Sequence, residues 1–421
     1  MMYLLRLSLR SLANRRFSAL LTMLAIALSV ALLLGVERIR TEARASFANT
    51  ISGTDLIVGA RSGSVQLLLY SVFRIGNATN NISWESYQRI SDHPRVDWAI
   101  PVSLGDSHRG FKVMGTDAQY FEHFRFGREQ PLVFAQGAAF DDLYQAVIGA
   151  DVARDLGYKP GDEIVLAHGT GSVSFVDHAD KPFRVSGILA RTGTPVDRTV
   201  HISLEGMQAI HLGWNSGMPA RGGRQISADN ARQIDLTPDS LTAVLLGLDS
   251  RIATFAVQRD INQYRAEPLL AILPGVALQE LWSLLGTAEK ALFLVSSCVV
   301  LTGLIGMLTA VLAGLNERRR EMAILRSVGA RPMHVFGLLL SEALVLTVAG
   351  IACGLLILYA ALGVARPWLL DHYGLFIAIQ MPASREWLLL GAILLASVLM
   401  GCIPAWRAYR LSLNDGLTIR I

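Results

Sequence analysis

The polar residues that could do chemistry form no recognised catalytic motif. A P-loop requires Gly-Lys followed by Ser or Thr, so that the lysine reaches the nucleotide phosphates. None of the four lysines follows a glycine; they are Lys112, Lys159, Lys181 and Lys290. There is also no Gly-x-Ser-x-Gly nucleophile elbow and no His-Glu-x-x-His zinc pair. We therefore expect no catalytic residue in this chain and no ATP hydrolysis by a Walker site.

Histidines and one carboxylate are the remaining candidates for a site. His168, His178, His201 and His211 could bind a metal, but their spacing matches no recognised ligand pattern, so we predict no metal site. Glu342 stands in an otherwise apolar run, where such residues often mark a pathway. For Glu342 we favour an interhelical hydrogen bond or a water-exposed position near the cytoplasmic side over a substrate site.

The elements that position these residues include long apolar runs. Of the 421 residues, 52% are hydrophobic and only 17% are charged, which excludes a disordered chain and an ordinary cytosolic enzyme. Four uncharged runs each reach the roughly 20 residues that cross a bilayer. These runs are Phe17–Val36, Ala291–Leu315, Ala343–Ala365 and Trp387–Trp406. The sequence therefore predicts a membrane protein with four spans.

The basic residues cluster next to the spans, which argues against nucleic acid as a partner and sets the orientation. Arginines precede the first span, dominate the loop between the second and third spans, and follow the fourth. Under the positive-inside rule all three regions are cytoplasmic. Residues 37–287 and the short 366–386 loop then lie outside the membrane on the far side. A cleavable signal peptide is a weaker alternative for the N-terminus, because its removal would leave three spans.

The exported segment is expected to fold as a mixed α/β domain. Charged residues in 37–52 predict that the first span continues outward as an amphipathic stalk helix, and Ala277–Lys290 predicts a matching helix before the second span. The expected strands are Asp55–Val58, Gln145–Ile148, Glu163–Ala167, Phe183–Leu189, Thr199–Ser203 and Leu241–Leu248. The expected helices are Trp84–Ile90, Ala150–Leu156 and Ser250–Tyr264. The exported segment contains no cysteine and must therefore fold on its core alone.

One stretch of the exported segment, Val65–Ile75, is unusually apolar. It is too short to span a bilayer, and we favour a buried helix of the domain core. The alternative is an element that docks a lipophilic substrate, a partner or the outer leaflet. Its candidate contact residues are Leu67, Leu68, Leu69, Tyr70 and Phe73.

The loop Asn316–Pro332 predicts a short cytoplasmic amphipathic helix held between two spans. Gly329 and Pro332 provide a helix stop, and four side chains supply an apolar side. A helix that lies in the lipid headgroups is the alternative. If the helix instead contacts a protein, we expect Met322, Ile324, Leu325 and Val328 to be the seated side chains and Glu317, Arg320 and Arg326 to be rim contacts.

This loop, together with Ser341-Glu342-Ala343, resembles the coupling region of ABC transporter permeases of the MacB, FtsX, LolC and LolE type. Asn14-Arg15-Arg16 before the first span is similar to the family's N-terminus, and the stretch from Pro404 to Ala408 is similar to its Pro-Ala-x-x-Ala closing motif. In the exported segment, Val147–Val165 and Phe183–Leu189 resemble the MacB-like periplasmic core.

The resemblance implies a permease subunit of the bacterial inner membrane with both termini in the cytoplasm and the large domain in the periplasm. Its partners would be two copies of a separate ATPase subunit, which would bind ATP and Mg²⁺, a second permease copy or close homologue, membrane lipid, and a periplasmic adaptor or lipoprotein. The chain itself would hold no cofactor. ATP-driven movement of the domain would export or extract a lipoprotein, lipid, peptide or drug.

The corresponding segments follow from the spans and the resemblance. They are a cytoplasmic N-terminus (1–16), a first span (17–36), a periplasmic core domain with stalk helices (37–287), a second span (288–315), a coupling loop (316–333), a third span (334–365), an outer loop (366–386), a fourth span (387–406) and a cytoplasmic tail (407–421). Two other functions share this topology. One is an FtsX-like regulator that activates a periplasmic hydrolase, and the other is a receptor or scaffold.

Overall fold

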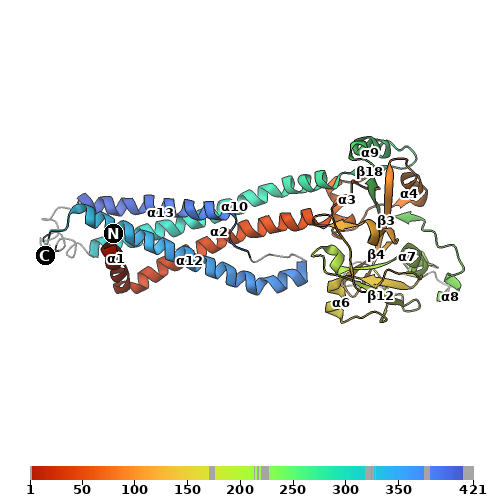
Figure 1. Cartoon of the computed structure of the whole chain (residues 1–421), viewed down its shortest axis with the longest axis horizontal. Coiled ribbons are helices and arrows are strands. Elements are labelled where there is room, and N and C mark those ends of the chain that lie inside the picture. The colour runs from red at the N-terminus through yellow and green to blue at the C-terminus, as the bar shows by residue number, and fades with distance from the viewer. Residues whose placement is uncertain are drawn as a thin grey trace. The chain divides into compact units, whose positions relative to one another are not determined.

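The computed structural model of the chain describes residues 2–169, 176–212, 214–215, 218–219, 227–317, 324, 327, 329–373 and 380–410 (Figure 1). Its contacts divide the chain into two units. One comprises Met1–Glu42, Gly286–Leu369 and Ile377–Ile421, and the other comprises Ala43–Leu285 and Leu370–Phe376. The helices α2 (Arg16–Thr50) and α10 (Pro274–Glu317) run through the boundary without a break.

The first unit is a helical bundle. It also contains α1 (Met2–Asn14), α12 (Pro332–Tyr373) and α13 (Ser384–Arg410). Among the described residues, four helices are long and apolar enough to cross a membrane, and they contain the four predicted spans. Because such a helix is apolar on all sides, one face can contact lipid while the opposite face packs against the other helices. The prediction of four membrane helices with a large mixed α/β domain between the first and second is confirmed.

Both predicted stalk helices are also confirmed. Helix α2 continues to Thr50, and α10 begins at Pro274, slightly before the predicted start. Proline suits this first position because a helix leaves its first N–H groups without an intrahelical partner. The two helices contact each other within the second unit, where the rings of Phe47 and Trp282 lie 5.5 Å apart and the Arg44 guanidinium lies 5.4 Å from the Trp282 ring.

The second unit is built on a sheet in which strands from distant parts of the chain alternate. The main path has the order β18-β1-β17-β3-β4-β13-β8-β12-β7, and β9, β10 and β11 join it from the side. The pairs β4–β13 and β8–β12 are parallel, and the other described pairs are antiparallel. A chain that combines both kinds of pairing needs crossover helices as well as hairpins.

The strands are mostly short. Their bounds are β1 (Leu56–Ala60), β2 (Ile82–Ser83), β3 (Val96–His108), β4 (Phe111–Thr116), β5 (Arg125–Phe126), β6 (Gln130–Pro131), β7 (Phe134–Gly137), β8 (Gln145–Ile148), β9 (Glu163–Ile164), β10 (Ala167–His168), β11 (Val176–Asp177), β12 (Phe183–Leu189), β13 (Thr199–Ser203), β14 (Trp214–Asn215), β15 (Met218–Pro219), β16 (Ser240–Leu241), β17 (Ala243–Leu248) and β18 (Leu269–Ile272).

Short helices cover this sheet (Figure 1). They are α3 (Ser64–Ser71), α4 (Trp84–Ser91), α5 (Gln119–His123), α6 (Ala150–Leu156), α7 (Leu204–His211), α8 (Ala228–Ala231) and α9 (Thr254–Asn262), with 3-10 turns η1 (Pro195–Arg198) and η2 (Arg251–Ala253). Serine caps start several of them: the Ser83 hydroxyl accepts from the Ser86 amide and the Ser203 hydroxyl from the Gly206 amide. The predicted helices at 84–90 and 150–156 are present, whereas the predicted 250–264 helix is the shorter α9 preceded by η2.

Candidate functional site

The predicted coupling segment lies between the end of α10 at Glu317 and the start of α12 at Pro332. Of its apolar candidates, Ile324 is described, and its side chain is 52% exposed. The candidates that lie outside the described residues are Arg320, Met322, Leu325, Arg326 and Val328. Gly329 has a φ of 103°, a conformation that favours glycine and suits the predicted helix stop. The coupling role of the segment stays a prediction.

Two glycines let α12 approach α2 closely inside the bundle. A Cβ at Gly350 would lie 2.7 Å from an Ile26 methyl carbon, and a Cβ at Gly354 would lie 2.7 Å from the Ala27 carbonyl oxygen. Their spacing of four residues forms a small-xxx-small stripe, which brings helix backbones together in membranes. Close packing of this kind holds α12 against α2 in a defined arrangement.

Glu342 is buried in the helical unit and accepts a hydrogen bond from the Ser11 hydroxyl of α1. This contact joins two helices that are more than 300 residues apart in the sequence. The interhelical hydrogen bond that we favoured for Glu342 is therefore present, and the carboxylate has a structural partner inside the bundle.

A second polar group of the helical unit is a cluster of ion pairs that joins α2, α10 and α13. The Arg38 guanidinium lies 3.6 Å from the Glu386 carboxylate and donates to the Gln380 carbonyl at 2.6 Å. Glu37 lies 3.1 Å from Arg385 in the same unit. Arg38 and Glu386 are almost fully buried, so their mutual pairing offsets the cost of removing both charges from water.

The same cluster continues to α10. Arg40 lies 2.7 Å from Glu37 and 3.7 Å from Glu289. From the sequence we placed Glu37, Arg38 and Arg40 on a stalk helix but did not pair them. The pair Glu37–Arg40 is local, but the other partners, Glu289, Arg385 and Glu386, lie hundreds of residues further along the chain.

The apolar stretch 65–75 forms α3 and the turn after it in the second unit. Leu67, Leu68 and Tyr70 are at most 1% exposed, Phe73 is also buried, and Leu69 is half-buried. All five belong to, or pack against, one hydrophobic core. The burial agrees with the core interpretation of this stretch, and these side chains present no exposed docking patch in this structure.

The second unit contains a cavity of about 360 Å³ beside the turn that follows α3. Phe47, Phe73 and Ile75 contribute apolar surface to it. Three basic side chains also line it, and these are Arg74, Lys112 and Arg198. Burial lowers the pKa of the Lys112 ammonium, so this charge is only partly screened by water. The cavity can accept a molecule that combines an anionic group with an apolar body.

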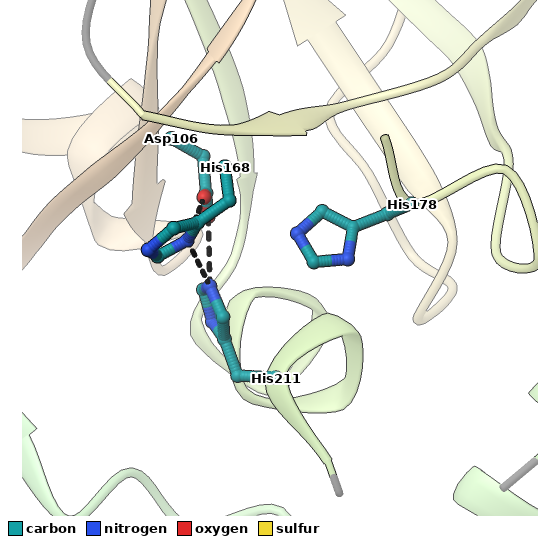
Figure 2. A group of neighbouring side chains, drawn as sticks. All are labelled: Asp106, His168, His178 and His211. Atoms are coloured by element: carbon teal, nitrogen blue, oxygen red, sulfur yellow. Dashed lines mark hydrogen bonds and ion pairs between the residues drawn. The ribbon is translucent and has the colours of Figure 1, made fainter. Parts of the chain in front are cut away.

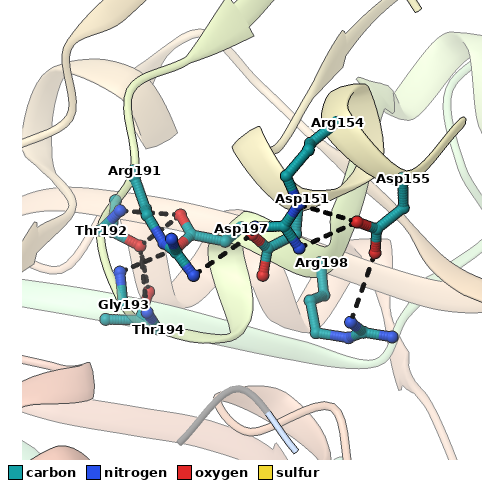
Figure 3. A network of polar contacts seen from close by, with 9 residues as sticks. All are labelled: Asp151, Arg154, Asp155, Arg191, Thr192, Gly193, Thr194, Asp197 and Arg198. Atoms are coloured by element: carbon teal, nitrogen blue, oxygen red, sulfur yellow. Dashed lines mark hydrogen bonds and ion pairs between the residues drawn. The ribbon is translucent and has the colours of Figure 1, made fainter. Parts of the chain in front are cut away.

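The loop that forms one wall of this cavity is held by Asp197 (Figure 3). Its carboxylate accepts from the Thr192 amide and hydroxyl, each at 2.8 Å, and from the Gly193 amide at 2.7 Å. Burial raises the pKa of Asp197, and these hydrogen bonds counteract the rise. Nearby, Asp151 lies 2.8 Å from Arg154 and 3.6 Å from Arg191. The network fixes the backbone between β12 and β13.

The four candidate histidines of the second unit do not share one environment. His201 is buried on β13, where its Nδ1 lies 3.2 Å from the Val147 carbonyl oxygen and its ring 5.2 Å from that of Tyr120. The other three lie together with a buried aspartate, and their side chains form a group that could hold a metal ion. Sequence spacing predicted no such group, because its members lie on four separate segments. The group consists of Asp106, His168, His178 and His211.

Two family models match consecutive parts of the chain. Residues 19–264 match the MacB-like periplasmic core domain, and residues 293–413 match the FtsX-like permease C-terminal domain. The first match contains the whole sheet apart from β18, and the second contains the last two membrane helices with most of α10 inside the bundle.

The chain is also similar to two kinds of curated export protein. A macrolide export ATP-binding/permease protein MacB from Nitrobacter winogradskyi is 24% identical over 414 residues, covering 94% of this chain and 57% of the relative. A pyoverdine export ATP-binding/permease protein PvdT from Pseudomonas syringae pv. syringae is 23% identical over 351 residues, covering 80% of this chain and 48% of the relative. The chain thus spans about half the length of these relatives.

Among solved structures, the periplasmic region of MacB from Actinobacillus actinomycetemcomitans aligns with a TM-score of 0.33 at 11% identity, over 55% of this chain and 94% of that structure. The periplasmic core model by itself covers more than half of the chain, and the FtsX-like model covers most of the remainder. The chain therefore belongs to the MacB-type family of ABC transporter permeases, with a MacB-like periplasmic core domain and an FtsX-like permease C-terminal domain.

Proposed function

We propose that the chain is the permease subunit of an ABC transporter whose ATPase is a separate chain, and that ATP hydrolysis moves its exported domain to drive export or extraction of a substrate. The observation that carries the proposal is the continuity of α2 and α10 from the helical unit into the second unit. An unbroken helix transmits displacement along its axis, because a sharp bend would break the backbone hydrogen bonds at the point of bending.

Contacts on both sides of the boundary support joint movement of the two helices. In the helical unit Arg40 of α2 lies 3.7 Å from Glu289 of α10. In the second unit the Trp282 ring of α10 contacts Phe47 and Arg44 of α2. A displacement of either helix would therefore be shared by the other, and the domain between them would move as one body.

We further propose that the segment between α10 and α12 is the contact for the ATPase. Replacing Leu325 with Asp should place an unpaired carboxylate in that contact, which costs several kcal/mol. The measurement is copurification of the ATPase and the ATPase activity of the complex in nanodiscs. Replacing the exposed Ser327 with Asp adds the same charge to the same short segment and is the matched control. Equal ATPase copurification by the two variants would favour the lipid-surface alternative.

Helix continuity can be tested separately at Ala45, an exposed residue of α2 in the second unit. Proline at this position removes a helical hydrogen bond and costs about 3 kcal/mol, whereas serine keeps the helix. We expect the Ala45→Pro variant to retain the ATPase while losing the ATP-dependent change in hydrogen exchange of the exported domain. An unchanged response to ATP would contradict mechanical transmission through α2.

The proposed orientation places the second unit in the periplasm and both termini in the cytoplasm of a bacterial inner-membrane protein. It can be tested by impermeant thiol labelling after the three native cysteines are replaced by alanine. A cysteine at the exposed Gln233 should be labelled from the periplasm, and one at Ser327 should not. Labelling in the opposite pattern would reverse the topology.

A bound substrate distinguishes an exporter from an FtsX-like regulator. Both require the ATPase contact and the helix continuity, but only an exporter needs a substrate in the complex. Mass spectrometry of small molecules, peptides and lipids retained by the complex from native membranes supplies that readout. Retention of a substrate that is lost on ATP hydrolysis would favour the exporter.

A further inference from the structure

Three imidazoles and one carboxylate meet in the exported domain although they come from four segments of the chain (Figure 2). Each residue offers one ligand atom, and these four atoms all lie within 4.8 Å of one another. Figure 2 shows the rings of His168 and His211 beside the Asp106 carboxylate, with the His178 ring directed toward them. The sequence spacing of these residues gave no sign of this group.

The backbone fixes the positions of all four. Asp106 and His168 are direct partners in the pairing of β3 with β10. His178 follows β11, the next strand, and its amide donates to the Leu166 carbonyl at 2.8 Å. His211 is the last residue of α7. The group therefore connects three neighbouring strand segments to one helix of the same domain.

The distances among three of these donors match those around a metal ion. The Asp106 oxygens lie 3.1 Å from His168 Nδ1 and 3.4 Å from His211 Nε2, and these two nitrogens lie 3.3 Å apart. Ligands at about 2.0–2.1 Å from a tetrahedral Zn²⁺ are separated by roughly 3.3–3.4 Å. The two imidazole nitrogens thus already have the spacing of two ligands of one ion, and each faces a different oxygen of the Asp106 carboxylate.

The tautomer of His211 adds an independent argument. Its Nδ1 lies 2.8 Å from the Met207 carbonyl oxygen, which can only accept, so Nδ1 carries a proton. Its Nε2 lies 3.4 Å from the Asp106 carboxylate, where it can donate to that carboxylate when protonated and offer a lone pair to a metal ion when it is not. Such a backbone hydrogen bond on the outer nitrogen is the usual support for a metal-binding histidine.

The composition and burial of the group suit a divalent ion. The Asp106 and His178 side chains are at most 1% exposed, so one carboxylate and one imidazole are held away from water beside the two other imidazoles. A buried carboxylate among imidazoles is a donor set that a divalent metal cation would suit.

We propose that Asp106, His168, His178 and His211 bind a divalent transition-metal ion of the zinc class. Imidazole-rich sites select Zn²⁺ and its first-row neighbours, whereas Mg²⁺ and Ca²⁺ require oxygen ligands. The His168 and His211 side chains are 30% and 28% exposed, so an ion can enter from solution. Bound metal would tie α7 to the β3–β10–β11 strands and make the stability of the exported domain depend on metal supply.

The test uses the full-length protein in nanodiscs, purified with an affinity tag that contains no histidine and freed of metal by chelation. Zn²⁺ binding is measured by competition with a chromophoric chelator, and Co²⁺ serves as a spectroscopic probe of tetrahedral coordination. We expect one Zn²⁺ per chain. Removal of a residue that only hydrogen-bonds to a metal ligand typically weakens metal binding by about 10–100-fold. His168→Ala and His211→Ala each remove a ligand itself, so each should weaken Zn²⁺ binding by at least about 100-fold.

His93→Ala is the matched control, because the His93 side chain is 27% exposed, lies in the same unit and pairs with Asp260 at 3.8 Å outside the group. It should bind Zn²⁺ like the wild type. Metal-free thermal denaturation checks that each variant folds, and His168→Gln replaces the alanine variant if that one does not. Saturating Zn²⁺ should raise the wild-type melting temperature and leave that of His168→Gln unchanged. Absence of Zn²⁺ binding by the wild type, or equal binding by the variants, would overturn the proposal.

Discussion

Replacing Leu68 with Ala tests whether the apolar stretch around α3 is core. Leu68 is fully buried and belongs to a cluster that includes Leu67, Tyr70 and Ile57. Truncation removes buried methyl groups and leaves a cavity that the surrounding sheet can only partly fill. Substitutions of this kind cost about 2–5 kcal/mol, and the full burial of Leu68 places the expected loss in the upper half of that range.

Leu69→Ala is the matched comparison, because it makes the same chemical change one residue away on a half-buried side chain. Its expected cost is about 1 kcal/mol, since part of the side chain is already in water. Urea-dependent pulse proteolysis of the full-length protein in nanodiscs measures both values, with fragments of the second unit as the signal. The membrane helices are protected by lipid and do not obscure the transition.

Two results would refute the reasoning. One is a Leu68→Ala protein that unfolds within about 0.5 kcal/mol of the wild type, which a fully buried leucine does not permit. The other is a protein of unchanged stability that has lost its function in cells. That second result would mean that the stretch becomes exposed during the working cycle and contacts a substrate or partner.

Three further predictions concern other parts of the molecule. Asp197→Ala removes the acceptor of three hydrogen bonds and should cost about 1.5–3 kcal/mol, with faster hydrogen exchange confined to the turn after β12. Gly354→Ala should lower the thermal stability of the helical unit because the new Cβ meets backbone of the facing helix, whereas Gly363→Ala, with open space around it, should not. Burial, followed by a nearby arginine charge, lowers the pKa of His201 to about 3. The unfolded chain therefore binds a proton at His201 that the fold excludes, and this residue's share of the stability should be lost as pH drops below about 6.5, by at most about 1.4 kcal/mol per pH unit. The pH dependence of stability should be shallower in His201→Gln than in the wild type.

The membrane helices and their extensions could be predicted because their signals are local. A run of about 20 apolar residues indicates a span without information from the rest of the chain. The alternation of charged and apolar residues after Val36 likewise indicates that the helix continues. The strands at 145–148, 183–189 and 199–203 were likewise predicted from their β-branched residues and flanking turns.

The longest strand was missed. Strand β3 contains Pro101 and Gly105, which are typical strand breakers, and it bulges between Leu104 and Ser107. It persists because it is central in the sheet and pairs with three other strands. The side chains that meet around Asp106 depend on this pairing and on its register, so no pattern within one segment could reveal them. The glycine stripe at 350–354, in contrast, was visible in the sequence and was overlooked.

The lengths of α2 and α10 have a geometric consequence. At 1.5 Å per residue, 35 and 44 residues correspond to rods of about 52 Å and 66 Å, while the hydrocarbon core of a bilayer is about 30 Å thick. A rod of about 52 Å that tilts by about 10° about one end displaces its other end by roughly 9 Å. Under the proposed function, a change of tilt among the membrane helices would therefore become a displacement of several ångströms at the outer ends of the two helices. Work could then be done on a substrate that never passes between the spans.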